Sequence, residues 1–172
     1  MGVAVVLVVG SFGLGALLAS PVGGSTTVAS GVLVGVQGPG GGGAVERYGP
    51  NRTLTWARTD ALAYHDVTRL DDGRVLAAYV VDSARCGDYP APCGRTGFRV
   101  FDPEQNDLVR EWSVPVRSSR NSEVHDVEPL GDGRYLVADM DAEAIYEVGR
   151  DGEGTWRWNA SSFYEAPPDP TR

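Results

Sequence analysis

Short runs of apolar and β-branched residues alternate along the chain with turns built on Gly, Pro and Asp, a pattern typical of β-strands. One stretch of this pattern occurs at residues 65–79 and again sixty positions later, at residues 125–139. Each copy has a strand that ends at Leu, a turn on Asp-Gly and a second strand, which together predict a β-hairpin. Self-similarity at such a fixed spacing indicates a repeat architecture.

Each repeat contains two more predicted strands after the hairpin. A third strand covers residues 98–102 in the first copy and 144–148 in the second. A turn rich in Pro, Asn, Asp or Gly follows, and then comes a fourth strand that carries Trp, at 108–112 and 155–158. Each full repeat is therefore expected to form a four-stranded unit.

An eroded copy of the same unit precedes these two. Residues 31–36, 44–48 and 52–56 occupy the places of the second, third and fourth strands, and the first is reduced to a segment near 26–28. This copy has no His-Asp pair. The tryptophans of the last strands are expected to pack between units; they are Trp56, Trp112 and Trp158.

Four-stranded units of about 40 to 60 residues that end in an aromatic strand are typical of β-propeller blades. We therefore predict an all-β fold: a partial β-propeller of about two full four-stranded antiparallel blades plus one eroded blade, preceded by an N-terminal apolar helix. The blades are expected at residues 25–58, 59–116 and 117–172.

Closing a propeller ring takes roughly four to eight blades, more than this chain supplies. The chain stops 14 residues after Trp158, whereas the preceding repeat runs 13 residues from Trp112 to His125. It therefore ends about where the next His-Asp pair would begin. We expect an N-terminal piece of a longer protein or a fragmentary gene product, inactive by itself, with part of any active site elsewhere.

The N-terminal region predicts a membrane-directed segment. Residues 1–45 contain no charged side chain, and only Ser11 interrupts the apolar and small residues of Val3 to Ala19. Residues 1–20 fit a signal peptide or an N-terminal membrane anchor helix equally well, with a buried core helix as the alternative. Residues 21–24 are expected to form a linker, and the bulk of the chain is expected to be extracellular.

The charge composition restricts the kinds of partner that we expect for this chain. The chain has 23 acidic residues against 15 basic ones, and every basic residue is Arg. An acidic surface with Arg in place of Lys suits a halophilic protein, although a GC-rich genome that favours Arg codons would give the same composition. No basic stripe is present to neutralise phosphates, so nucleic acid is not an expected partner.

The only two cysteines, Cys86 and Cys93, lie in a Gly- and Pro-rich insertion at residues 82–97. They are placed to form an intraloop disulfide, which persists outside the reducing cytosol; free thiols are the alternative. Metal binding would need more ligands than this loop offers. Two glycosylation sequons, at Asn51 and Asn159, agree with an exported surface.

The only two histidines, His65 and His125, occupy the same place in successive repeats. In a propeller the first strand of each blade lines a central channel, so both imidazoles are expected to point into it. Strict alternation would place His65 and Val67 on one face of the strand and Asp66 on the other. The structural alternative is that each His-Asp pair only ties strands together by hydrogen bonds.

The chain resembles the arylsulfotransferase (aryl-sulfate sulfotransferase) propellers, particularly their haloarchaeal relatives. The resemblance is carried by the His-Asp hairpin of residues 125–139, then by residues 145–148 and 156–158, and by the segment 162–172 that leads toward a further His-containing strand. It covers most of residues 25–172. The hairpin motif recurs across this family, whereas single copies of it also occur elsewhere.

The resemblance implies transfer of a sulfuryl group from a phenolic sulfate ester to a phenol, without a cofactor or a nucleotide-sulfate donor. A channel histidine accepts the group covalently in this family, and His65 and His125 match its repeated His position. Imidazole is a suitable nucleophile when neutral, and a two-step transfer would give ping-pong kinetics. Arg117 and Arg120, in the loop that enters the His125 strand, are candidate sulfate contacts or simply solvated loop residues.

A second hypothesis belongs to a different functional class. The absence of His from the first blade and the incomplete ring are also compatible with an exported, membrane-tethered propeller that binds a ligand or partner and catalyses nothing. A quinone-dependent or carbohydrate-acting propeller is disfavoured, because the chain shows no cofactor-binding or paired-acid signal.

Overall fold

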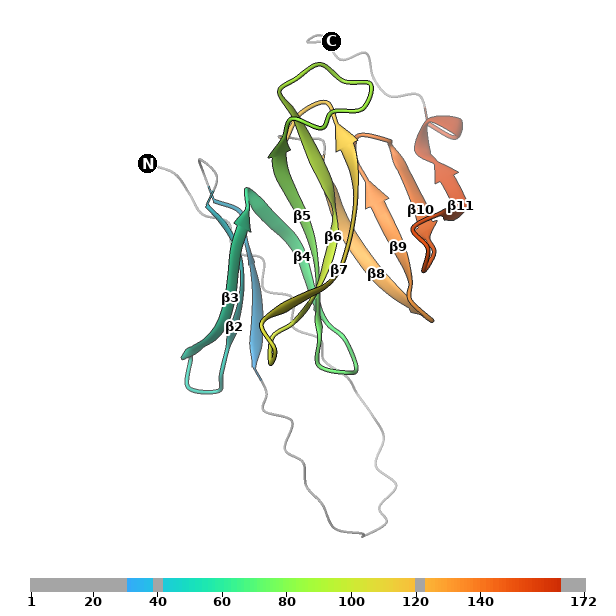
Figure 1. Ribbon diagram of the computed structural model, residues 1–172. Helices are drawn as coiled ribbons and strands as arrows, with labels where there is room; N and C mark the ends of the chain where they lie inside the picture. The colour runs from blue at the N-terminus through green and yellow to red at the C-terminus, as the bar shows by residue number, and fades with distance from the viewer. Residues whose placement is uncertain (1–30, 39–41, 120–122, 165–172) are drawn as a thin grey trace, which may run out of the picture.

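A computed structural model of the chain describes residues 31–38, 42–119 and 123–164. Within these ranges the protein is all-β, with three antiparallel sheets that stand in a row and do not close on themselves (Figure 1). Only one short 3-10 helix, Ala160–Ser162, accompanies the described strands. The prediction of an all-β fold is confirmed for the described residues.

The sheets follow one another in chain order. Sheet 1 contains β1 (Val32–Val36), β2 (Gly43–Tyr48) and β3 (Leu54–Ala61), paired in the order β1-β2-β3. Sheet 2 contains β4 (Ala63–Arg69), β5 (Val75–Ser83), β6 (Cys93–Asp102) and β7 (Asp107–Val116), and sheet 3 contains β8 (Val124–Gly131), β9 (Arg134–Asp139), β10 (Ala144–Val148) and β11 (Gly154–Asn159). Each strand of sheets 2 and 3 pairs with its neighbour in sequence.

The strands of sheet 2 are longer than the sequence suggested. Pairing of β5 with β6 continues to Ser83 and Cys93, so the third strand begins at Cys93 rather than at Phe98. The predicted insertion at 82–97 is thereby reduced to a loop at 84–92. Gly, Arg and Thr at 94–96 concealed this extension, because they gave no apolar run to mark a strand.

Two cores hold the row together, one at each junction. Tyr64, Val75 and Phe101 of sheet 2 bury against Val45 and Trp56 of sheet 1. The opposite face of sheet 2 buries against sheet 3 through the apolar residues Leu76, Ala78, Phe98, Val100, Val127, Tyr135, Val137 and Tyr146. Because both faces of sheet 2 are covered, β5 reads as an almost unbroken apolar run.

A buried arginine, Arg99, accompanies the first core. The Arg99 guanidinium donates to the Glu111 carboxylate at 2.8 Å and to the Tyr64 hydroxyl at 3.1 Å. It also lies over the Tyr79 ring, 3.9 Å from the ring centroid. The surrounding acceptors and the aromatic face compensate the cost of burying this cation.

Several predictions concern residues outside the described ranges: the signal or anchor helix at 1–20, the linker at 21–24 and the reduced strand near 26–28. Among the described residues, no helix has the length and apolar character needed to span a membrane.

Candidate functional site

The His-Asp pair of sheet 2 lies at a β-bulge in β4. Tyr64 pairs with Tyr79 and Val67 with Ala77, so His65 and Asp66 together stand opposite one residue of β5. The extra residue breaks the strict alternation of side chains. Tyr64 and Val67 consequently both contact the core between sheets 1 and 2, although they are three positions apart.

Sheet 3 has a β-bulge at the equivalent place in β8. Val124 pairs with Asp139 and Asp126 with Ala138, which leaves His125 as the extra residue. Val124 and Val127 are both fully buried in the core between sheets 2 and 3. The two repeats therefore share the β-bulge as well as the sequence motif.

Both His-Asp pairs line one cavity of about 210 Å³. The prediction that Asp66 faces away from His65 is wrong, because the bulge turns both side chains toward this cavity. Its described lining consists of Leu33, Gln37, His65, Asp66, Val67, His125 and Asp126. Residues from all three sheets thus contribute to one site.

The two imidazoles stack on one another inside the site. Their ring centroids are 4.6 Å apart and their planes differ by 25°. His125 keeps 46% of its side chain exposed, whereas both ring nitrogens of His65 are buried and have no hydrogen-bond partner. His125 is therefore the ring that an incoming molecule reaches first.

Burial sets the protonation states of His65 and Asp66. Desolvation, with a contribution from neighbouring His125, lowers the pKa of His65 to about 4, so this ring is neutral at pH 7. Desolvation and the nearby Asp126 carboxylate raise the pKa of Asp66 to about 6. The Oδ2 atom of Asp66 has no hydrogen-bond partner.

A buried carboxylate stands behind the outer histidine. Glu123 precedes β8 and is 7% exposed, and its Oε2 atom lies 3.8 Å from Nε2 of His125. A carboxylate beside an imidazole stabilises positive charge that develops on the ring during a reaction. Glu123 is thus placed to support chemistry at His125.

This arrangement can supply a nucleophile or a proton-transfer group. A neutral imidazole has a nitrogen lone pair, and Asp126 in the same lining is an exposed carboxylate. The described residues contain no group of three or more His, Cys, Asp or Glu side chains suited to hold a metal ion. No Arg is among the described side chains that line the cavity.

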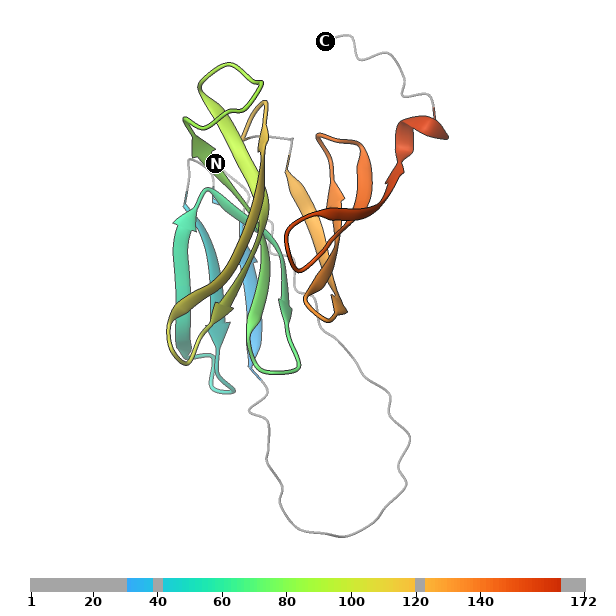
Figure 2. The same cartoon turned by 45° about the vertical axis from the view of Figure 1, so that its right-hand side comes forward.

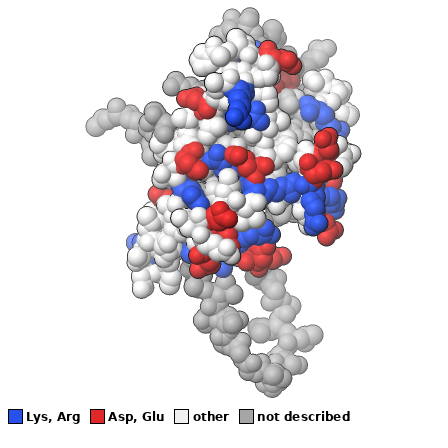
Figure 3. Space-filling view, in the orientation of Figure 1, with Lys and Arg blue, Asp and Glu red and all other residues white. Residues whose placement is uncertain are grey.

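Of the two candidate sulfate contacts, only Arg117 lies among the described residues, and it is not part of the cavity lining. Arg117 is exposed in a bend directly after β7 and is absent from the cavity lining, and Arg120 lies outside the described residues. Acidic and arginine side chains are intermixed on the face drawn in Figure 3, and no continuous basic stripe crosses it.

Sequence reasoning missed part of the lining. Leu33 belongs to β1 and Gln37 follows it, bridging to Ala63 at the start of β4. The approach is close because Gly35 has no side chain: a Cβ there would lie 2.8 Å from Val67 and 2.9 Å from the Tyr64 carbonyl. Because the first, eroded repeat has no His, its sequence did not indicate that Leu33 and Gln37 would line the cavity.

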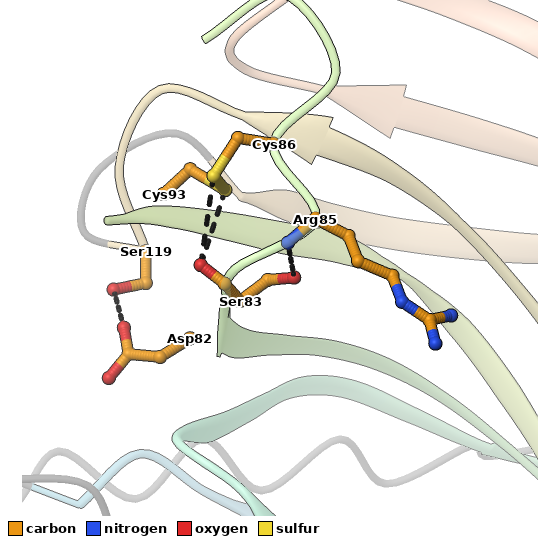
Figure 4. Close-up of a disulfide and its surroundings, with 6 residues drawn as sticks. All are labelled: Asp82, Ser83, Arg85, Cys86, Cys93 and Ser119. Atoms are coloured by element: carbon orange, nitrogen blue, oxygen red, sulfur yellow. Dashed lines mark hydrogen bonds between the residues drawn. A yellow bond between two sulfur atoms is a disulfide. The ribbon is translucent and has the colours of Figure 1, made fainter. Parts of the chain in front are cut away.

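Cys86 and Cys93 form a disulfide, with Cα atoms 5.5 Å apart, that joins the loop after β5 to the first residue of β6 (Figure 4). Both sulfur atoms lie within 3.7 Å of the Ser83 carbonyl oxygen, as contacts rather than hydrogen bonds because neither sulfur carries a hydrogen. The Ser119 hydroxyl donates to Asp82 at 2.6 Å beside this loop.

The two sequon asparagines are both at the surface. Asn51 is exposed in the turn between β2 and β3. Asn159 ends β11, is partly exposed and accepts a hydrogen bond from Arg157 at 2.6 Å. Both positions are sterically open to modification.

Neither a scan against protein-family models nor a search of curated proteins gave a match to this chain.

Proposed function

We propose that the histidine cavity is part of a sulfuryl-transfer site of the arylsulfotransferase kind, in which the three sheets are blades of an incomplete β-propeller. Support for the propeller comes from three similar sheets that stack face to face, with equivalent bulges in β4 and β8. The observation that carries the functional proposal is the stack of His65 on His125 in a shared cavity.

His125 is the proposed acceptor of the sulfuryl group, because its ring is exposed where that of His65 is buried. A ring nitrogen attacks sulfur, an N–S bond forms, the S–O bond to the aryl group breaks, and the phenolate leaves and takes a proton from water. The buried Glu123 carboxylate compensates the positive charge that develops on the imidazole.

The second step regenerates the histidine. The oxygen of an acceptor phenol attacks sulfur, the N–S bond breaks, and the phenol proton passes to Asp126 in the same lining. His65 stays neutral at pH 7, so it stacks against His125 without adding a second positive charge. Its role in this scheme is to position the His125 ring.

The direct test is release of nitrophenol from nitrophenyl sulfate, with and without a phenol acceptor. We expect a single burst of nitrophenol, without the sustained turnover that an incomplete propeller is not expected to support, and a chain that gains the mass of one sulfuryl group at neutral pH. His125→Ala should abolish both, whereas Thr68→Ala, on β4 but outside the cavity lining, should retain them. Equal bursts from the wild type and His125→Ala would exclude the covalent assignment.

A binding module without catalysis is the second candidate. The observation that favours it is the charge of the described lining, which holds two carboxylates, Asp66 and Asp126, and no Arg. Such a cavity suits a ligand that donates hydrogen bonds or carries positive charge. No nitrophenol release, combined with an Asp126→Asn variant that weakens binding of a small organic cation, would support this candidate over transfer.

Export to the cell surface, with residues 1–20 as a cleaved signal or membrane anchor, is part of the same proposal. The disulfide supports it, because such bonds persist outside the reducing cytosol. Fractionation of expressing cells, followed by N-terminal sequencing of the mature chain, tests it. A full-length chain in the cytosol would contradict export.

A further inference from the structure

The two junctions between sheets share a tryptophan contact. At the first, the Trp56 indole of β3 donates to the Asn106 side chain at 3.2 Å, in the turn between β6 and β7. At the second, the Trp112 indole of β7 donates to the Gly152 carbonyl at 3.1 Å, in the turn between β10 and β11. Each sheet therefore fixes its last strand to the final turn of the next sheet.

An arginine accompanies the tryptophan at each junction. Arg58 of β3 donates to the Asn106 carbonyl, and Arg110 of β7 donates to the Gly149 carbonyl at 2.7 Å. These charge-assisted hydrogen bonds run from the last strand of one sheet to turn carbonyls of the next. The junction is thus a repeated joint, built from a donor strand and an acceptor turn.

Sheet 3 repeats the tryptophan of this donor strand on its open face, with a second tryptophan in place of the arginine. In sheet 2 the joint face presents Leu76, Ala78, Phe98 and Trp112, with Ala78 paired to Phe98 and Phe98 to Trp112. The same register in sheet 3 places Leu136, Ala138, Ile145 and Trp158 on the face that points away from sheet 2. Trp156, at the place of Arg110, is 53% exposed.

Sheet 1 carries the acceptor half. In the turn after β2, the Gly49 amide donates to Thr53 and the Arg52 amide donates to Gly49, each at 2.9 Å. The turn after β10 has the same two bonds, from Gly149 to Glu153 and from Gly152 to Gly149. Residues at equivalent places have positive φ, 59° at Arg52 and 88° at Gly152.

On the open face of sheet 1, β1 contributes apolar residues and β2 contributes Ala44, Glu46 and Tyr48. Leu33 packs toward sheet 2, so alternation along β1 directs Val32, Val34 and Val36 to the opposite face. Val32 is 49% exposed. In Figures 1 and 2, sheets 1 and 3 are the two ends of the row, so neither open face is covered by another described sheet.

We propose that sheet 3 of one copy docks onto sheet 1 of a second copy, and that the reciprocal contact closes a pair. A second copy is the occupant that fits, because the chain bears one donor half and one acceptor half of the same joint. The described residues of two copies supply six sheets, within the range of about four to eight that closes a propeller ring. A head-to-tail contact either closes in this way or grows into an open chain.

The pairing predicts a definite assembly and does not depend on sulfuryl transfer. The full chain should sediment in solution with twice its mass of 18.3 kDa. Trp156→Glu, on the donor face, and Val32→Glu, on the acceptor face, should each give single chains. Leu108→Ser, which removes an exposed apolar side chain from sheet 2, is the matched control and should leave the pair intact.

A cross-link tests the head-to-tail register. With Asn51→Cys in the turn after β2 and Phe163→Cys beside Trp158 in one chain, a short bismaleimide should join two chains, whereas either cysteine alone should not. Cross-linking by a single cysteine, a wild-type chain that sediments alone, assemblies larger than two, or pairs that persist in both glutamate variants would each overturn the proposal.

Discussion

Replacing the buried histidine should change how stability depends on pH. A pKa of His65 lowered from 6.5 to about 4 means that the unfolded chain binds a proton at this site more readily than the native protein. Native stability is therefore lost as pH falls from about 6.5 toward 4. The pKa difference corresponds to at most about 3 kcal/mol, and residual solvent screening lowers this value.

His65→Asn removes this titration and leaves the neighbouring groups in place. Asp66 acts in the opposite direction, because its raised pKa makes the native state lose stability as pH rises from 3.8 toward about 6. His125, Asp126 and Glu123 are the other titratable groups near the ring. Asp66 and these three groups all remain in the variant. Their contributions to the pH dependence of stability therefore largely cancel when the variant is compared with the wild type.

The assay is urea unfolding at pH 7, 5.5 and 4, followed by the fluorescence of the four tryptophans at one fixed protein concentration. Between pH 7 and 4, the free energy of unfolding of the wild type should fall by up to about 3 kcal/mol more than that of His65→Asn. Asp66→Asn is the companion variant and should remove the opposing loss. A stability difference between wild type and His65→Asn that stays constant over this range would refute the buried, neutral state of His65.

Three further predictions concern the packing and the disulfide of the fold that positions the site. Gly35→Ala should destabilise the protein by about 1–3 kcal/mol in thermal or urea unfolding, because the added methyl meets the β4 backbone, whereas Gly42→Ala meets nothing within 4 Å and should have little effect. Cys86→Ser with Cys93→Ser should cost about 2 kcal/mol from the entropy of a short loop, and thiol labelling of the wild type should require a reductant. Phe98→Ala should cost about 3–5 kcal/mol, because the ring is fully buried between sheets 2 and 3; an unchanged urea midpoint would contradict that packing.

Much of the strand order was predictable from the repeat. The copies at 65–79 and 125–139 and the Trp-bearing strands after them gave the two four-stranded sheets and their antiparallel order. Trp56 and Trp112 lie at the sheet junctions, as expected. These features were predictable because strand pairing and turn chemistry are local and recur in register.

The geometry of the site was less predictable, because it depends on an irregularity. Alternation along a regular strand placed Asp66 away from His65, whereas the β-bulge brings both to the cavity. A bulge is fixed by what packs on either side of it, here Tyr64 and Val67 in one core, and short apolar patterns do not specify it. Two apolar positions three apart, repeated at Val124 and Val127, are the sequence signal that would have revealed it.

The chemistry of the cavity belongs to the joint between sheets rather than to either sheet alone. His65 is a β4 residue, yet besides desolvation its pKa responds to His125 and Glu123, which belong to β8 or directly precede it. Asp66 responds in the same way to Asp126. Stacking of the sheets therefore shifts the pKa values of His65 and Asp66. The cores that hold the sheets together thereby also set the protonation state of the site. In a closed pair, the same coupling would link each cavity to the docking of the second copy.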